Sequence, residues 1–185
     1  LVDVTDPARP EIRASVALPD ACVTAEFSAD SRQLVVPTLG PETLIVDTSD
    51  PDRPTVAHRL TTGIGASPSA GYAHDASLLA TSGGDQTIRL WDVNDPVAPT
   101  ELASFPAPGG EIYWTAFSAD DQLLLITSST GQVTVVDVSD PGEPVPWAVL
   151  GATTDPLLYQ GRSASPDGGL LAVGVEGAMV MWQLD

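Results

Sequence analysis

Side chains able to perform nucleophilic or acid–base chemistry are few in this chain and lie far apart in the sequence. The 185 residues include two histidines, one cysteine and no lysine. Covalent catalysis needs a nucleophile within hydrogen-bond reach of a base that a third group orients. His58 falls in a predicted outer strand, His74 in a predicted turn, and Cys22 has no second cysteine to pair with. We therefore expect two surface histidines, an apolar packed cysteine and no catalytic residue.

The motifs that bind common cofactors are also missing from the sequence. Residues 63–67 read Gly-Ile-Gly-Ala-Ser, which lacks the later glycine of a dinucleotide loop, and a phosphate-binding loop would require a lysine. No cysteine–histidine cluster has the spacing of zinc ligands. One alternative, which depends on the repeats described below, is a propeller hydrolase or lactonase with a metal in its central channel, and Glu26 and Glu111 are its nearest candidate ligands. Because such a site needs several converging oxygens, we expect no metal and no cofactor, and the channel enzyme remains an alternative.

The chain is built from a repeated phrase, in which an apolar run is followed by Asp and then by Asp-Pro. It reads LVDVTDP at 1–7, LIVDTSDP at 44–51, IRLWDVNDP at 88–96 and VTVVDVSDP at 133–141. The positions that follow the apolar run lie 44–46 residues apart and are Asp3, Asp47, Asp92, Asp137 and Gln183. A turn of the Ser-Ala-Asp type recurs every 45–47 residues, with Asp30, Asp75, Asp120 and Asp167. Two landmarks that share a period of about 45 residues indicate the blades of a β-propeller.

Each repeat contains four predicted strands. Two of them are apolar, β-branched runs bounded by Gly, Pro, Asp and Ser, at 78–82 and 87–93 in one repeat. A third strand precedes the Ser-Ala-Asp turn and a fourth follows the Asp-Pro turn, so each repeat forms one four-stranded antiparallel blade. The corresponding apolar runs elsewhere are 33–36, 43–47, 122–127, 133–138, 170–175 and 179–184. We predict one all-β propeller domain with units 1–18 (partial), 19–62, 63–107, 108–152 and 153–185 (partial).

Residues 81–92, TSGGDQTIRLWD, resemble the Trp-Asp (WD) repeat of the β-propeller family. The Trp-Asp pair occurs once, and the equivalent pairs are Val46–Asp47, Val136–Asp137 and Trp182–Gln183. In the family, a His, an Asp, a Ser or Thr and the Trp share a hydrogen-bonded network. The resemblance assigns three of these roles to Asp85, Thr81 and Trp91 and leaves the histidine role empty. We therefore expect degenerate blades that apolar packing stabilises. The Val-Asp-Val-Ser-Asp-Pro phrase also resembles LVIVD-type repeats, which leaves open a structural role in a bacterial surface protein.

The charge of the chain restricts its partners. Twenty-five acidic residues against seven arginines give a formal net charge of −18. This balance opposes binding to nucleic acid or anionic membranes and favours basic protein partners. The absence of lysine and the Ala-, Asp-, Pro- and Val-rich usage suggest an actinobacterium-like source. No apolar run is long enough to span a membrane and no signal peptide is visible, so we predict a cytoplasmic protein, with a surface or secreted location as the alternative.

The repeats amount to about four blades, whereas WD propellers usually close with about seven. A closed ring removes the exposed edges of its sheets. We favour a chain that is part of a larger ring. Two further solutions stay open: two copies could form one ring, or the strand at 11–18 could complete the last blade and leave 1–4 as a surplus strand.

The WD resemblance implies that one face carries the loops leading into the inner strands and the turns between the middle strands. The candidate residues for binding a partner follow two of these loops and are Tyr113, Trp114, Tyr159 and Arg162. Aromatic and Arg side chains dominate the binding energy of interfaces. Alternation along a strand requires Tyr113 or Trp114 to point inward, and packing between blades is the alternative role for both. We expect Trp147, in an outer strand, to cover an edge.

The opposite face is expected to collect the aspartates of the Ser-Ala-Asp and Asp-Pro turns. Because these aspartates are spread over the blades, turn formation explains them better than a calcium site does. The sequence therefore favours a non-catalytic protein–protein interaction scaffold or sensor, from a larger bacterial protein. The channel enzyme and the structural repeat of a surface protein are the alternatives.

Overall fold

The computed structural model describes residues 1–22, 24–63, 69–107, 109–130, 132–150, 162–165, 170–175 and 178–183. Every regular element in these residues is a β-strand, and all paired strands are antiparallel. Within the same residues, no helix is long and apolar enough to cross a membrane.

Three four-stranded sheets form the middle of the chain, and in each the strands are hydrogen-bonded in sequence order. The first blade contains β3 (Glu26–Phe27), β4 (Gln33–Pro37), β5 (Glu42–Asp47) and β6 (Thr55–Thr61). The second contains β7 (Ser69–Tyr72), β8 (Leu78–Ser82), β9 (Thr87–Asp92) and β10 (Thr100–Pro106). The third contains β11 (Ile112–Phe117), β12 (Leu123–Ser128), β13 (Val133–Asp137) and β14 (Val145–Leu150).

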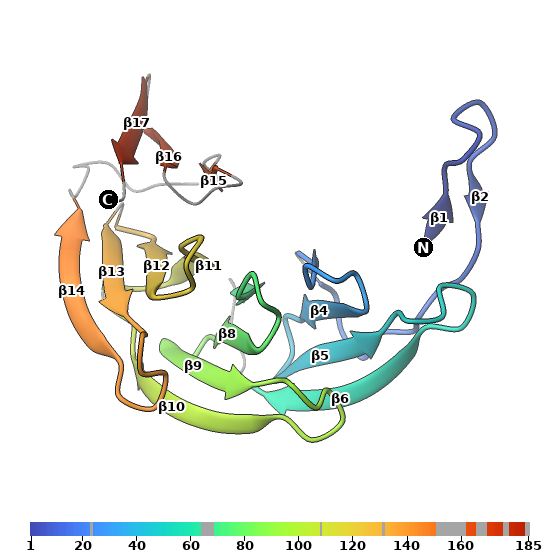
Figure 1. Cartoon of the computed structure of the whole chain (residues 1–185), viewed down its shortest axis with the longest axis horizontal. Helices are drawn as coiled ribbons and strands as arrows, with labels where there is room; N and C mark the ends of the chain where they lie inside the picture. Colours follow the sequence, from blue (N-terminus) through green and yellow to red (C-terminus); the bar gives the residue numbers. More distant parts are fainter. Residues whose placement is uncertain are drawn as a thin grey trace.

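Smaller sheets flank the three blades. A two-stranded sheet contains β1 (Val2–Asp3) and β2 (Glu11–Ile12), and a three-stranded sheet contains β15 (Arg162–Ala164), β16 (Leu170–Val175) and β17 (Ala178–Gln183). Figure 1 shows the sheets in an open arc, with β6, β10 and β14 on the outside and the small sheets at its two ends. The arrangement confirms the predicted all-β fold of antiparallel propeller blades, about four in number.

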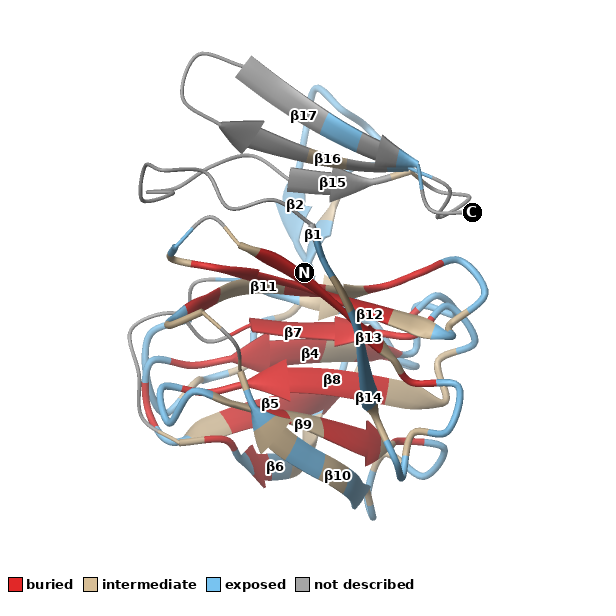
Figure 2. Cartoon of the chain, turned by 90° about the vertical axis from the view of Figure 1, so that its left-hand side faces the viewer, coloured by how far each residue is buried: buried red, intermediate tan, exposed pale blue. Residues whose placement is uncertain are grey.

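The core lies between neighbouring blades. Leu90 of the second blade packs in one cluster with Phe117 and Ile126 of the third. A second cluster joins Val35 of the first blade to Trp91 of the second. Each fully buried side chain of this size stabilises the fold by about 1.5–3 kcal/mol relative to exposure. Figure 2 shows that the middle strands are largely buried, while the outer strands and the turns are largely exposed. Each blade therefore depends on its neighbours, as repeat architectures do.

The recurring Asp after the apolar run has a local role in each blade. The carboxylates of Asp47, Asp92 and Asp137 accept hydrogen bonds from the backbone N–H two residues later, at 2.8, 2.9 and 2.9 Å. This contact forms an Asx turn that ends the third strand. The hydroxyls of Ser49 and Ser139 also bond to their aspartates and hold the pKa of Asp47 and Asp137 below its usual range.

The Ser-Ala-Asp turns are closed in a similar way. In the first blade, the Ser28 hydroxyl donates to Asp30 at 2.7 Å, and the third blade repeats this bond from Ser118 to Asp120 at 2.6 Å. These hydroxyls lower the pKa of both carboxylates. The fourth turn residue adopts a left-handed backbone in all three blades, with φ of 59° at Ser31, 60° at Ala76 and 58° at Asp121. The Asp-Pro aspartates Asp50, Asp95 and Asp140 likewise accept a backbone N–H two residues later.

A β-bulge recurs in the outer strand of each of the three four-stranded blades. The pairing between the third and fourth strands skips one residue, and the skipped residues are Ala57, Leu102 and Trp147. A bulge leaves its extra residue outside the ladder and re-aims its side chain. The bulge therefore occurs at the same position in the three blades, but its extra residue has a different side chain in each.

Candidate partner-binding surface

The loops that lead into the inner strands and the turns between the middle strands meet at one end of each blade, which we call the loop face. In the third blade, Ser129 N donates to the Glu111 carbonyl at 2.7 Å. The Thr130 hydroxyl donates to the Gly109 carbonyl at 3.0 Å. In the first blade, Leu39 N donates to the Ala21 carbonyl at 2.8 Å. In the first and third blades, these bonds fasten the leading loop to a turn of the same blade.

Tyr113 and Trp114 lie at the start of β11, next to the loop face. The β11–β12 pairing joins Ile112 to Ser128 and Trp114 to Thr127, so the ladder skips Tyr113. Strict alternation would bury one of the two aromatic side chains and expose the other. The bulge disturbs the alternation, and both side chains are half-buried. Each side chain therefore combines packing in the blade with a partly solvent-exposed surface.

The other two candidate residues follow the third blade in the sequence. Tyr159 lies outside the described residues. Arg162 begins β15, where its backbone pairs with Val173. The structure thus places the backbone of Arg162 on the first strand of the sheet that follows the third blade. Trp182, the last repeat position, pairs with Leu171 in the β16–β17 ladder.

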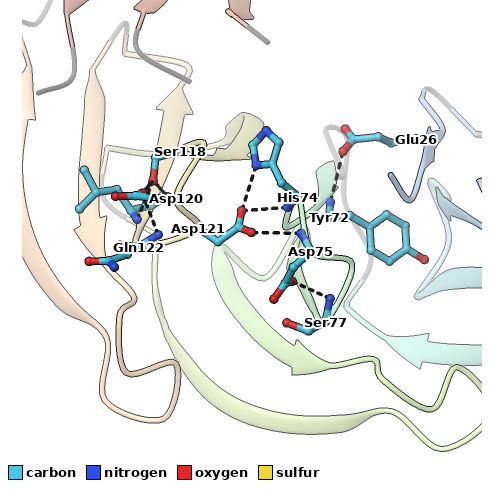
Figure 3. A network of polar contacts seen from close by, with 10 residues as sticks. Glu26, Tyr72, His74, Asp75, Ser77, Ser118, Asp120, Asp121 and Gln122 are labelled. Carbon is cyan, nitrogen blue, oxygen red and sulfur yellow. Dashed lines mark hydrogen bonds and ion pairs between the residues drawn. The ribbon is translucent and has the colours of Figure 1, made fainter. Parts of the chain in front are cut away.

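The opposite end of the blades, where the Ser-Ala-Asp turns lie, is the turn face, and a polar network joins two blades there (Figure 3). The Asp121 carboxylate of the third blade accepts hydrogen bonds from the His74 backbone N–H at 2.8 Å and from the Asp75 backbone N–H at 3.1 Å. The His74 Nδ1 lies 2.9 Å from the same carboxylate and donates to it, since a carboxylate only accepts. One aspartate thus fixes the neighbouring turn through three bonds.

A related contact joins the first blade to the second. Glu26 Oε1 accepts a hydrogen bond from the Tyr72 backbone N–H at 3.2 Å, and the Tyr72 hydroxyl donates to Gln33 Oε1 at 3.1 Å. Burial raises the pKa of the Glu26 carboxyl, against the smaller opposing effect of the Tyr72 N–H. Burial also raises the pKa of the Tyr72 hydroxyl. These groups connect blades, and their contacts use Glu26 as a hydrogen-bond acceptor for the neighbouring strand.

The two carboxylates considered for a channel metal do not converge. Glu26 lies in β3 close to the turn face, whereas the exposed Glu111 lies at the loop-face end of β11. Among the residues that the structure describes, no three His, Cys, Asp or Glu side chains come together in an arrangement that could hold a metal ion. Cys22 is exposed, so the prediction of an apolar packed cysteine is wrong.

The second blade contains a buried polar pair. Trp91 Nε1 donates to Thr81 Oγ1 at 2.9 Å, and both side chains are almost fully buried. Asp85, which the family resemblance groups with this pair, has other partners. Its carboxylate accepts from Arg89 Nη2 at 2.6 Å and from the Thr87 backbone N–H at 3.1 Å. The Arg89 guanidinium holds the pKa of Asp85 below its usual range.

Residues 58–92 match the family described as WD domain, G-beta repeat. The chain is also similar to the Target of rapamycin complex subunit LST8 of Saccharomyces cerevisiae, with 34% identity over 71 residues. The aligned segment covers 38% of this chain and only 23% of the length of that relative. Both similarities support a WD-repeat family for this chain.

The matched WD repeat extends across two blades. It begins in β6, the outer strand of the first blade, and ends at Asp92 in the third strand of the second. It therefore contains both residues of the Trp91–Thr81 pair. It contains His74 and Tyr72 but not their partners, Asp121 and Glu26. The local sequence does not predict these two contacts, because each joins residues 46 or 47 positions apart. The available signal was the acidic residue at the fourth turn position, Asp121, where the other turns have Ser31, Ala76 and Gly168.

Proposed function

We propose that this chain is a non-catalytic protein–protein interaction module that serves as a scaffold or sensor within a larger bacterial protein. The observation that carries the proposal is that two half-buried aromatic side chains, Tyr113 and Trp114, lie beside a fastened loop at the loop face of the third blade. The WD repeat supports the proposal, and the LST8 relative is by its name a subunit of a complex.

The geometry of the leading loop favours this surface. Gly109 and Gly110 have φ of +85° and +98°, a conformation that favours glycine and bends the chain before β11. The Thr130 hydroxyl holds this bend in place through Gly109. A fixed loop beside aromatic side chains reduces the conformational entropy lost on binding. Tyr113 and Trp114 are therefore our proposed anchors, together with Tyr159 and Arg162.

Several features of the proposed protein follow from its sequence. The net charge of −18 favours basic partners and opposes nucleic acids and anionic membranes. We propose a cytoplasmic location and one repeat domain divided into blade units near residues 19–62, 63–107 and 108–152. Association with a second copy to complete a ring and a role as an LVIVD-like surface repeat are the competing arrangements.

A site-specific photo-crosslinker tests the proposed surface. A benzophenone amino acid replaces Tyr113 in one variant and Asp52, an exposed residue after β5, in the control. We expect a discrete crosslinked protein from position 113 and none from position 52. The captured protein is then purified and titrated against the wild-type chain and Trp114→Ala, for which we expect about tenfold weaker binding, or 1.4 kcal/mol.

Two outcomes would contradict the proposal. Equal affinity of the captured protein for the wild type and for Trp114→Ala would show that the loop face is not the binding surface. Tight, stoichiometric binding of Zn²⁺, Mg²⁺ or Ca²⁺ in calorimetric titration, abolished by Glu26→Gln, would instead favour the channel enzyme.

A further inference from the structure

The outer strand of the third blade exposes a set of apolar side chains away from both faces of the arc. In β14, Val145, Trp147 and Val149 are 58%, 57% and 61% exposed. Figure 2 shows β14 on the side turned toward the viewer, with exposed residues along much of its length. We call these three residues the β14 patch. An exposed Trp between two exposed valines offers a large apolar area on one strand.

The other blades show that the fold does not require this patch. The β-sheet registers define equivalent positions in the three outer strands, and the bulge falls at the middle one in each case. The equivalent residues are Thr55, Ala57 and Arg59 in the first blade and Thr100, Leu102 and Ser104 in the second. Only the third of these blades has an apolar residue at all three positions. The patch therefore needs a reason beyond blade stability.

The backbone of β14 indicates how a partner would bind. Trp147 is the residue that the β13–β14 ladder skips, so its side chain is displayed by the bulge. Pro146, its neighbour, has no N–H to offer to an added strand. A proline and a bulge together disfavour edge-to-edge strand pairing. A partner would therefore bind β14 through side-chain contacts, with Trp147 at their centre.

The charge around the patch selects the kind of partner. No Arg, Lys or His occurs between Arg89 and Arg162 in the sequence. The turn before β14 carries the exposed Asp140 and Glu143, and the strand before that turn ends at Asp137. A second copy would bring like charge against like charge, and nucleic acids and anionic lipids would be repelled in the same way. Arg or Lys side chains on a partner would complement these carboxylates.

We propose that the β14 patch is a docking surface for a partner protein that inserts Trp147 into an apolar pocket bordered by Arg or Lys. This inference rests on the proposed interaction function but uses a different surface from the loop face. Trp is among the residues that contribute most to interfaces, and complementary charges beside it give orientation and speed of association.

The experiment replaces the three patch residues of the third blade with the residues at the equivalent positions of the second blade. The triple variant V145T/W147L/V149S places the residues of β10 on β14, so the fold already accepts them at equivalent positions. The probe is a synthetic amphipathic peptide of Leu and Lys. The controls are the same peptide with Leu replaced by Ser and the same peptide with Lys replaced by Glu. Calorimetric titration measures binding to every variant, because W147L removes the tryptophan of the patch, and circular dichroism checks that each variant is folded.

We expect the Leu/Lys peptide to bind the wild-type chain and to bind the triple variant at least about tenfold more weakly. Both control peptides should bind poorly, and added salt should weaken the complex. Leu102→Ala, at the equivalent position of the second blade, should leave the affinity unchanged. Trp114→Ala should also leave it unchanged, which separates this surface from the loop face.

Three results would overturn the inference. The first is equal binding of the Leu/Lys peptide to the wild type and the triple variant, and the second is no binding to either. The third is a dimer of the wild-type chain in light scattering that the triple variant abolishes, because a second copy would then be the occupant. A loop-face partner captured at position 113 would still support the proposed function in each case.

Discussion

Asp121 in the third blade holds His74 in the second through both the backbone and the side chain of that residue. The carboxylate lies 2.8 Å from the His74 backbone nitrogen and 2.9 Å from its Nδ1. It also accepts the Asp75 N–H at 3.1 Å. Apolar packing between blades has little directional preference, whereas these bonds require a specific geometry. The turn face thus sets the position of one blade against the next.

Removal of the Asp121 carboxylate should loosen this junction. We expect Asp121→Ala to lower the free energy of unfolding by about 1–3 kcal/mol, because two backbone N–H groups lose their acceptor. Asp121→Asn should cost less, since Asn keeps an acceptor and tolerates the left-handed backbone, φ 58°. Urea unfolding measures both. Ser31→Ala, at the equivalent left-handed position of the first blade, serves as the control for local backbone effects, and equal losses at positions 31 and 121 would contradict the role of the junction.

The Trp91–Thr81 bond should contribute to the stability of the second blade beyond apolar packing. Trp91→Phe removes the Nε1 donor and leaves the buried Thr81 hydroxyl without it, at an expected cost of about 1–3 kcal/mol. Because Phe is also smaller, a double-mutant cycle with Thr81→Val isolates the bond. We expect a coupling energy of about 1 kcal/mol from thermal or urea unfolding. A coupling energy near zero would assign the whole effect to packing.

Gly83 should not tolerate a side chain, whereas its neighbour should. A Cβ at Gly83 would lie 1.4 Å from the carbonyl oxygen of Thr62, a backbone atom just after β6. Gly83→Ala is therefore expected to destabilise the chain by about 1–3 kcal/mol through overpacking. Gly84 is exposed in the same turn and provides the matched control as Gly84→Ala. The midpoints of urea unfolding compare the stability of the two variants. Similar midpoints would refute the predicted clash at Gly83.

The buried Glu26 should make stability depend on pH. Burial raises its pKa in the folded chain above the ordinary value of 4.5. Folding therefore favours the protonated form; that stabilisation is fully present below the unfolded pKa and is lost as pH rises through the folded pKa. At neutral pH, Glu26→Gln should be more stable than the wild type, because Gln still accepts the Tyr72 N–H without a buried charge. The difference should disappear below about pH 4.5.

The exposed Glu143→Gln is the control for this pH series, since it removes one negative charge from the surface without changing the Glu26 contact. Unfolding free energies across the pH range compare the three proteins. If Glu26→Gln is less stable than the wild type at neutral pH, the charged hydrogen bond to Tyr72 outweighs the cost of burial.

The sequence by itself determined the features that depend on neighbouring residues. The period of about 45 residues, the strands at 78–82 and 170–175, and the Asx turns at Asp47, Asp92 and Asp137 are local in origin. Each arises from continuous apolar runs, turn residues or a side chain that bonds two positions along the chain.

The tertiary structure alone decided how the repeats meet and which side chains stay exposed. His74–Asp121 and Glu26–Tyr72 join residues 46 or 47 positions apart, and their partners depend on the angle between blades. The bulge at Tyr113 leaves both Tyr113 and Trp114 half-buried, which alternation excludes. A single skipped residue changes the direction of the side chains around it, and this change depends on the pairing strand and not on the local sequence.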